Sequence, residues 1–238
     1  MIPKVIHYCW FGRNPLPELA ERCIASWRKF FPDYEIKEWN EDNFDVSIIP
    51  YTRDAYEAKK YAFVSDYARF WILYHFGGLY FDTDVEVIKP MEDLISLGSF
   101  MGFEFLSNKG NCAVNPGLGM CAVPGLDLYR EVLNGFGALS FWNMDGIVNN
   151  YSMIPLVTEI LMGKGLKGDG RVEMVSGVYF YPPDYFNPFD DATGRLKKTE
   201  NTRTIHWFMK SWLPKEPALL VLGKRLVRRL LSAIGLRK

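Results

Sequence analysis

The sequence has no net charge, few cysteines and no long apolar run. Its 28 Lys and Arg residues balance 28 Asp and Glu residues over 238 positions. A protein that binds nucleic acid through many phosphates carries an excess of basic residues, so we expect no nucleic-acid partner. The four cysteines form no Cys-x-x-Cys pair, which argues against zinc knuckles and dithiol redox sites.

Membrane-spanning and targeting signals are also missing. No apolar stretch approaches the roughly 20 residues that cross a bilayer. No apolar segment of the signal-peptide type follows Met1. We therefore expect a cytoplasmic protein, and we leave open a peripheral attachment to the inner face of the plasma membrane.

Aromatic residues are abundant, at 16% of the chain, and 48% of all residues are hydrophobic. This composition excludes disorder and predicts a sizeable folded core. The first half alternates strand and helix patterns, which indicates an α/β fold with a parallel sheet. The expected elements are a strand over Val5–Phe11, a helix over Leu16–Phe31, a strand over Tyr34–Trp39, a loop over 41–54, a helix over Ala55–Phe76 capped by Asp54, and a strand over Leu79–Ile88.

The second half is less regular, with turn residues between short apolar runs. We expect one domain over residues 1–213 with irregular insertions, followed by a basic helix over residues 214–238. The expected elements of this half are strands over Phe100–Leu106, Cys112–Val123 and Val172–Tyr181, with helices over Pro124–Leu133 and Ile154–Met162.

Two carboxylates interrupt the apolar strand expected over Leu79–Ile88. Because side chains alternate along a strand, Asp82 and Asp84 would share a face about 7 Å apart. Two like charges on one face repel unless a cation lies beside them, and hard divalent ions such as Mn²⁺ or Mg²⁺ prefer oxygen ligands. The alternative is that both acids are solvated where the strand ends.

The preceding helix is apolar nearly all round, yet it carries Ser65, Asp66 and Arg69 on one face. A buried helix must pair such groups or direct them toward a polar cavity. The Gly77-Gly78 turn folds this helix against the strand, which would bring these three side chains and the two aspartates around one cleft. An internal Asp66–Arg69 pair without function is the alternative.

Trp10 and His206 extend the candidate site. Trp10 ends the first strand, where α/β sheets bind ligands, and an indole there can stack on a base. His206 can ligate a metal and lies in a segment with Ser211 and Trp212. A core position is an equal alternative for Trp10, and for a histidine beside aromatic residues it is the more common one.

These motifs, taken in order, resemble the DXD-containing sugar-transferase family. That family includes bacterial capsular-polysaccharide glycosyltransferases, yeast-type initiating mannosyltransferases and the glucosyltransferase domains of clostridial toxins. The resemblance extends from residue 2 to about residue 95, with a further match at the end of the domain. Its motifs are Ile6-His7-Tyr8-Cys9-Trp10-Phe11-Gly12, Ser65-Asp66-x-x-Arg69, Gly77-Gly78-x-Tyr80-x-Asp82-x-Asp84, and His206 to Trp212.

The resemblance implies a GT-A-like, Rossmann-type sheet with helices on both faces. It also implies a nucleotide-sugar donor, UDP-linked in preference to GDP-linked, a Mn²⁺ or Mg²⁺ ion, and transfer of a hexose with retention of configuration. Asp66 and Arg69 would hold the donor sugar and diphosphate, Asp82 and Asp84 the metal, and His206 would be an extra ligand. The donor would also contact Trp10, Ser65, Tyr80, Ser211 and Trp212.

The acceptor side is less certain, because Ser152-Met153-Ile154-Pro155 replaces the Thr-Gly-Pro of several relatives. Asn115 is a candidate for lining the donor-sugar pocket. A saccharide or a lipid-linked oligosaccharide is the expected acceptor, in bacterial capsule or surface-polysaccharide synthesis. Two alternatives stay open: a haloacid-dehalogenase-type phosphatase, which also uses Asp-x-Asp, and a non-catalytic nucleotide-sugar-binding module.

The tail differs in charge from the rest of the chain. Residues 215–238 hold seven basic residues and one acidic residue. Leucines recur on one side of this predicted helix, at positions such as Leu222, Leu226 and Leu230, while Arg225 and Arg228 occupy another. Such a helix either docks on an anionic membrane or packs on the domain with its charged face solvated.

Overall fold

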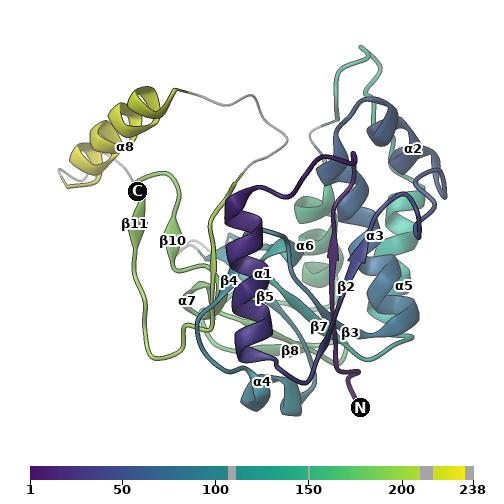
Figure 1. Ribbon diagram of the computed structural model, residues 1–238, viewed down its shortest axis with the longest axis horizontal. Helices are drawn as coiled ribbons and strands as arrows, with labels where there is room; N and C mark the ends of the chain where they lie inside the picture. Colours follow the sequence, from purple (N-terminus) through teal and green to yellow (C-terminus); the bar gives the residue numbers. More distant parts are fainter. Residues whose placement is uncertain (107–110, 150, 210–216, 234–238) are drawn as a thin grey trace.

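A mixed β-sheet forms the centre of the protein in a computed structural model that describes residues 1–238 except 107–110, 150, 210–216 and 234–238 (Figure 1). β1 (Val5–Cys9) pairs in parallel with β2 (Glu35–Trp39) and β3 (Gly78–Tyr80). The strand order is β2-β1-β3-β7-β5-β9-β8, with β6 on β5. The remaining strands of this sheet are β5 (Ser99–Leu106), β6 (Cys112–Val114), β7 (Met120–Ala122), β8 (Glu173–Val175) and β9 (Val178–Tyr181).

Helices cover both faces of the sheet and enclose two apolar cores. One face carries α1 (Glu18–Phe30), α4 (Glu92–Leu97) and α7 (Pro183–Phe186). The other carries α2 (Pro50–Glu57), α3 (Tyr61–Phe76), α5 (Asp127–Gly137) and α6 (Met153–Gly163). α1 buries a stripe at helical spacing, Ala20, Cys23, Ile24 and Trp27, and exposes its charged side. The predicted α/β architecture with helices on both faces is confirmed.

The predicted strand over Leu79–Ile88 is wrong as one continuous element. The chain leaves the main sheet after β3 and turns at Asp82, whose carbonyl accepts a hydrogen bond from the Val85 N–H at 3.0 Å. It then forms β4 (Val85–Val87), which pairs with β12 (Thr204–His206) in a separate two-stranded sheet. The two aspartates therefore lie in a turn, where carboxylates can face a cavity instead of the packed faces of a sheet.

The predicted helix over Ala55–Phe76, with a loop before it, is also wrong. α2 begins at Pro50, within the expected loop, and ends before a break at residues 58–60, where Lys59 adopts a left-handed φ of 57°. α3 then begins at Tyr61. It ends at Phe76 with Gly77 as its C-cap, so the predicted C-terminal end is confirmed. The break directs residues 59–61 toward the cleft described below.

Two further strands were predicted too long. The expected strand over Cys112–Val123 is divided into β6, a 3₁₀ turn over Pro116–Leu118 and β7. The expected strand over Val172–Tyr181 is the hairpin of β8 and β9, which turns at Ser176 and Gly177 with φ values of 51° and 78°. The first helix of this half, α5, is displaced from the expected Pro124–Leu133, and α4 was not expected.

The C-terminal helix α8 (Ala218–Ala233) packs on the hairpin of β10 (Phe189–Asp190) and β11 (Arg195–Leu196). Arg225 donates to Asp191 Oδ1 at 2.9 Å, and Arg229 donates to the Thr193 carbonyl at 2.6 Å. The basic side of α8 therefore faces the domain. Its apolar side is exposed, with Leu222, Leu226 and Leu230 at 53%, 50% and 67%. One alternative from the sequence was a helix that packs on the domain with its charged face in solvent. In the structure the charged face packs on the domain and the apolar face is exposed.

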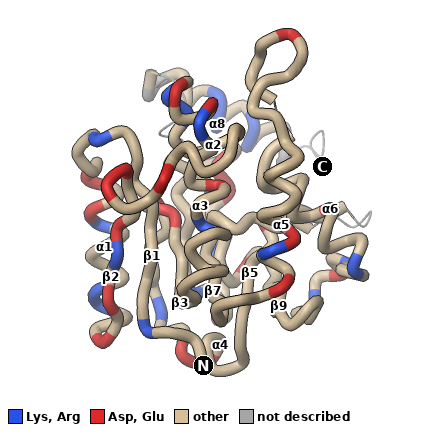
Figure 2. The backbone as a smooth tube through the Cα atoms, turned by 90° about the vertical axis from the view of Figure 1, so that its right-hand side faces the viewer, with Lys and Arg blue, Asp and Glu red and all other residues tan. Residues whose placement is uncertain are grey.

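α8 lies at the end of the molecule toward which β1 and β2 run, far from the N-terminus (Figures 1 and 2). Within the described part of the chain, no helix is long and apolar enough to cross a membrane.

Buried His7 links the first strand to the turn after α3, and we expect it to make the fold acid-sensitive. Its Nδ1 accepts a hydrogen bond from Trp39 Nε1 at 3.0 Å, so its Nε2–H donates to the Gly77 carbonyl at 3.0 Å. Burial lowers the pKa of His7 to about 4, with Lys37 adding to the effect. Between about pH 6.5 and pH 4, His7 therefore binds a proton in the unfolded chain but not in the folded chain.

Stability should fall as the pH falls through this window, by up to about 3 kcal/mol from His7 alone. We expect His7→Gln to flatten the slope of unfolding free energy against pH, measured by urea denaturation. The exposed His75 provides the control, because His75→Gln should keep the wild-type slope. Equal slopes in all three proteins would contradict the assignment.

Candidate active site

A cleft of about 700 Å³ opens where β1 ends and the turn after β3 begins. Eight of the predicted site residues line it: Trp10, Ser65, Asp66, Arg69, Asp82, Asp84, Asn115 and His206. They come from β1, α3, the turn after β3, the loop after β6 and β12. Strand order in the sheet thus brings together residues that are far apart in the sequence.

Arg69 holds two of the acids in place. Its side chain is 3% exposed, and it contacts Asp66 Oδ1 at 3.0 Å and Asp82 Oδ1 at 3.1 Å. A second N–H reaches Asp82 Oδ2 at 3.2 Å, and Nε donates to the Ser65 carbonyl at 3.1 Å. The Asp66–Arg69 pair considered from the sequence is therefore present, but it extends to Asp82 and faces the cleft.

Tyr80 does not line the cleft, unlike Asp82 and Asp84 of the same motif. It is 1% exposed, and its hydroxyl donates to Asp82 Oδ1 at 3.1 Å while its ring lies 5.1 Å from the Arg69 guanidinium carbon. Tyr80 therefore supports Asp82 from below the surface of the cleft.

Asp66 is an unusual acid in this arrangement. Burial raises the pKa of Asp66 to about 7, and the charge of Asp82 adds to this effect, against the attraction of Arg69. A carboxyl group at that pKa can accept or donate a hydrogen bond near neutral pH.

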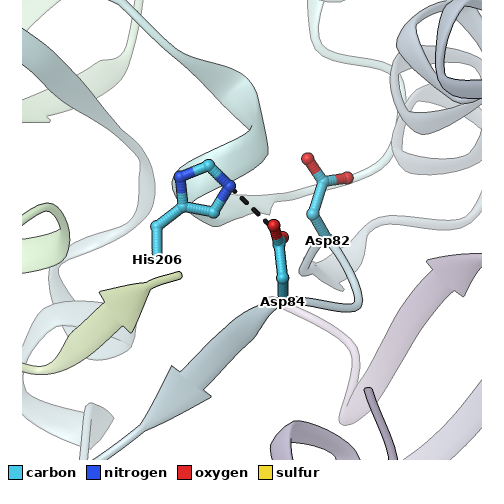
Figure 3. Close-up of side chains that lie close together, drawn as sticks. All are labelled: Asp82, Asp84 and His206. Carbon is cyan, nitrogen blue, oxygen red and sulfur yellow. Dashed lines mark ion pairs between the residues drawn. The ribbon is translucent and has the colours of Figure 1, made fainter. Parts of the chain in front are cut away.

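Asp82, Asp84 and His206 form a cluster that fits a metal ion. One ligand atom from each lies within 4.8 Å of the others (Figure 3). His206 Nε2 lies 3.2 Å from Asp84 Oδ1, and the buried His206 Nδ1 has no hydrogen-bond partner among the described residues. Two carboxylates and one imidazole are a donor set that suits a divalent cation.

Asp84 is held by the chain that follows β12. Its carbonyl accepts from the Trp207 N–H at 2.9 Å, and its Oδ2 accepts from the Met209 N–H at 2.7 Å. Burial opposes ionisation of Asp84, but His206 and the Met209 hydrogen bond outweigh it and lower the pKa of Asp84. Burial likewise opposes protonation of His206, and the attraction of Asp84 outweighs it and raises the pKa of His206. Both shifts therefore favour the carboxylate form of Asp84 beside the imidazolium form of His206.

The residues of the cleft that were not found from the sequence include Lys59, Lys60, Glu104 and Phe208. The lysines lie in the break between α2 and α3, which the apolar pattern does not reveal. Glu104 lies within the otherwise apolar β5 and accepts a hydrogen bond from Asn115 Nδ2 at 3.0 Å. A single acidic residue within an apolar strand is the sequence signal that could have identified Glu104. The predicted donor residues Ser211 and Trp212 lie outside the described residues.

The sequence around this cleft matches a known family region. Residues 17–101 fit the model described as a glycosyltransferase sugar-binding region containing a DXD motif. Residues 17–101 are thus a glycosyltransferase DXD region. This region includes Asp82 and Asp84 but ends before the Asn115 and His206 parts of the cleft.

Relatives of the DXD region occur among proteins of two yeasts. Inositol phosphoceramide mannosyltransferase 1 of Schizosaccharomyces pombe is 32% identical over 111 residues, which are 42% of this chain and 33% of the relative. Mannosyl phosphorylinositol ceramide synthase CSH1 of Saccharomyces cerevisiae is 28% identical over 109 residues, 42% of this chain and 28% of the relative. The chain therefore spans only about a third of the length of these relatives.

The fold extends beyond the DXD region. The solved structure of the PaToxG glycosyltransferase superposes with a TM-score of 0.54 over 69% of this chain and 70% of its own, at 17% identity. The two proteins share a fold.

The phosphatase alternative loses its support from these findings. The matched region belongs to glycosyltransferases, and Asp82 follows the third strand of the chain, not the first. Glu86, at the position where a phosphatase of that type would carry a hydroxyl residue, binds Trp207 Nε1 at 2.8 Å and lies 3.6 Å from Arg22.

Proposed function

We propose that this protein is a metal-dependent glycosyltransferase that moves a hexose from a nucleotide-sugar donor to a saccharide acceptor. The observation that carries the proposal is the cluster of Asp82, Asp84 and His206 in a cleft lined by the DXD region. Among divalent ions we favour Mn²⁺, because the set includes an imidazole nitrogen and Mg²⁺ prefers oxygen alone.

The donor would lie across the cleft with its base at Trp10. This indole is half-buried, and its Nε1 donates to the Asn14 carbonyl at 2.6 Å, which fixes the ring as a stacking surface. Lys59 and Lys60 would supply positive charge for the diphosphate, and Asp66 would bind a hydroxyl of the sugar. A UDP-sugar is our preferred donor.

The chemistry requires stabilisation of the diphosphate leaving group as the bond to the sugar breaks. A bound divalent ion supplies Lewis-acid stabilisation of that charge. Arg69 keeps Asp82 in position, and the backbone N–H of Met209 keeps Asp84 in position. We favour a retaining, same-face attack in which the acceptor proton passes to the leaving phosphate oxygen, since no carboxylate is assigned as a covalent nucleophile.

A thermal-shift screen of UDP-, GDP- and CMP-sugars with and without Mn²⁺ tests this function. We expect a UDP-sugar with Mn²⁺ to raise the melting temperature by several degrees, roughly 3–5 °C at saturating ligand. We also expect slow, Mn²⁺-dependent release of UDP from that donor. Stabilisation without any turnover would favour the non-catalytic binding module, and no stabilisation by any donor would contradict the proposal.

We further propose that the protein acts at the inner face of a bacterial plasma membrane, in capsule or surface-polysaccharide synthesis, with α8 on the lipid surface. The support is the exposed apolar side of α8, which lies on a helix with four basic residues. The leucines can enter the lipid interface, while Arg225 and Arg229 hold α8 on the β10–β11 hairpin with its apolar side outward.

Flotation with anionic vesicles tests this attachment. The triple variant Leu222→Gln, Leu226→Gln and Leu230→Gln should remain in the soluble fraction when the wild type floats with phosphatidylglycerol vesicles. A matched control replaces the exposed residues Leu97, Met144 and Ile147 by Gln and should float. Equal flotation of both triple variants, or none of the wild type, would overturn the attachment.

A further inference from the structure

A second hollow, of about 630 Å³, adjoins the cleft and has no role in donor binding. We call it the side hollow and define it by Glu104, Phe105, Asn187, Phe189, Asp190 and Phe208. Glu104 and Phe208 line both the cleft and the side hollow, so the two spaces meet at these residues. A molecule in the side hollow would therefore reach the edge of the cleft.

The walls of the side hollow combine aromatic and polar groups. Phe105 on β5 is 48% exposed and lines the side hollow, so part of its ring is available to a ligand. Asn187 also lines the side hollow and donates its Nδ2 to the Glu104 carbonyl at 3.0 Å, and its buried Oδ1 has no partner among the described residues. An aromatic face beside hydrogen-bonding groups suits a sugar ring, which has apolar faces and hydroxyl edges.

The charge of the side hollow restricts its ligand. Four acids line it, Glu104, Asp184, Asp190 and Asp191, against one basic residue, Lys197. Arg225 of α8 pairs with Asp191, which leaves an excess of negative charge. A phosphate group would be repelled here, whereas the hydroxyls of a neutral sugar can donate to the carboxylates.

Glu104 occupies the junction between the two spaces. Its Oε2 accepts the hydrogen bond from Asn115, which in turn accepts from the Gly117 N–H at 2.8 Å. This chain of bonds fixes the Glu104 carboxylate, and Glu104 lines the same cleft as Asp82 and Asp84. Glu104 is thus held where an acceptor sugar would approach the donor.

We propose that the side hollow binds the neutral saccharide head of the acceptor, with Phe105 packing on its ring and Glu104 accepting a hydrogen bond from it. This inference rests on the proposed transferase function and specifies its acceptor. Through the Arg225–Asp191 pair the side hollow borders α8, which places it between the cleft and the proposed membrane surface. The acceptor chemistry then differs from the phosphate-bearing lipid named for the yeast relatives.

Saturation-transfer NMR on the full chain with UDP and Mg²⁺, which is diamagnetic, tests the side hollow. The probes are the methyl glycosides of glucose, galactose and mannose, with glucose 6-phosphate as the anionic probe. We expect saturation transfer from the protein to at least one methyl glycoside and no saturation transfer to glucose 6-phosphate. Phe105→Ala and Glu104→Gln should each weaken that binding by about tenfold, as expected for loss of one well-formed contact.

Leu97→Ala is the matched control, since Leu97 is 59% exposed and lies outside both spaces, and it should bind the probe as the wild type does. Glu104→Gln preserves the shape of the side chain, so a folding defect in Phe105→Ala alone would not decide the result. Binding of no glycoside, equal binding of glucose 6-phosphate, or unchanged binding in both variants would overturn the proposal. Wild-type UDP binding in the same samples separates failure of the side hollow from failure of the transferase function.

Discussion

Asp84→Asn should lower donor hydrolysis and transfer by about 10³-fold or more, because it removes a charged ligand from the proposed metal cluster. Asn keeps the shape of the side chain and can still accept from the Met209 N–H, so the local fold should survive. What is lost is the negative charge that faces His206 at 3.2 Å and would face the cation. The measurements are UDP release from the donor and Mn²⁺ affinity by calorimetry.

Glu86→Gln is the matched control for this variant. Glu86 lies on the same strand, β4, but its carboxylate faces Trp207 and Arg22 outside the cleft. It should retain wild-type turnover and Mn²⁺ affinity. Equal rates in Asp84→Asn and the wild type would remove the metal assignment, and a loss in Glu86→Gln equal to that in Asp84→Asn would point to damage of β4 instead.

The sheet and its first elements could be predicted because local patterns determine them. β1, α1 and β2 follow from an apolar run, a helical stripe and an alternating strand, each ended by Gly, Pro or Asn. The break between α2 and α3 could not be predicted, because apolar residues lie on both sides of it and two lysines are acceptable in an exposed helix. The periodicity of apolar residues in the sequence does not indicate where tertiary packing changes the direction of the chain.

The candidate site was predicted in its residues but not in its geometry. The strand argument placed Asp82 and Asp84 on one face of an extended segment, whereas the structure places them in a turn between two sheets. That turn depends on the pairing of β4 with β12, which joins distant parts of the chain and leaves no local trace in the sequence. The two aspartates still lie in one cluster, because the turn brings them close together and Arg69 holds Asp82 in place.

Gly117→Ala should impair catalysis strongly, although less than Asp84→Asn, even though Gly117 has no side chain to contribute. A Cβ at this position would overlap Asp82 Oδ2 and would lie 3.0 Å from Asn115 Oδ1 and 3.1 Å from an Arg69 nitrogen. The Asp82 carboxylate is fixed by Arg69 and Tyr80, so it can yield only by breaking those contacts. Because displacement of a reacting group by about 1 Å can cost about 10²-fold in rate, we expect a loss of that order in donor hydrolysis.

The control is Gly137→Ala at the end of α5, where a Cβ would meet nothing within 4 Å. That variant should retain activity and stability, which separates a general effect of replacing glycine from the clash at Asp82. If the Gly117→Ala loss arises from a misplaced metal ligand, excess Mn²⁺ should restore part of the activity, since a weakened site still fills at high concentration. A loss that Mn²⁺ does not relieve in a folded variant would mean that Asp82 acts on the donor itself, and wild-type activity would mean that its position is not required.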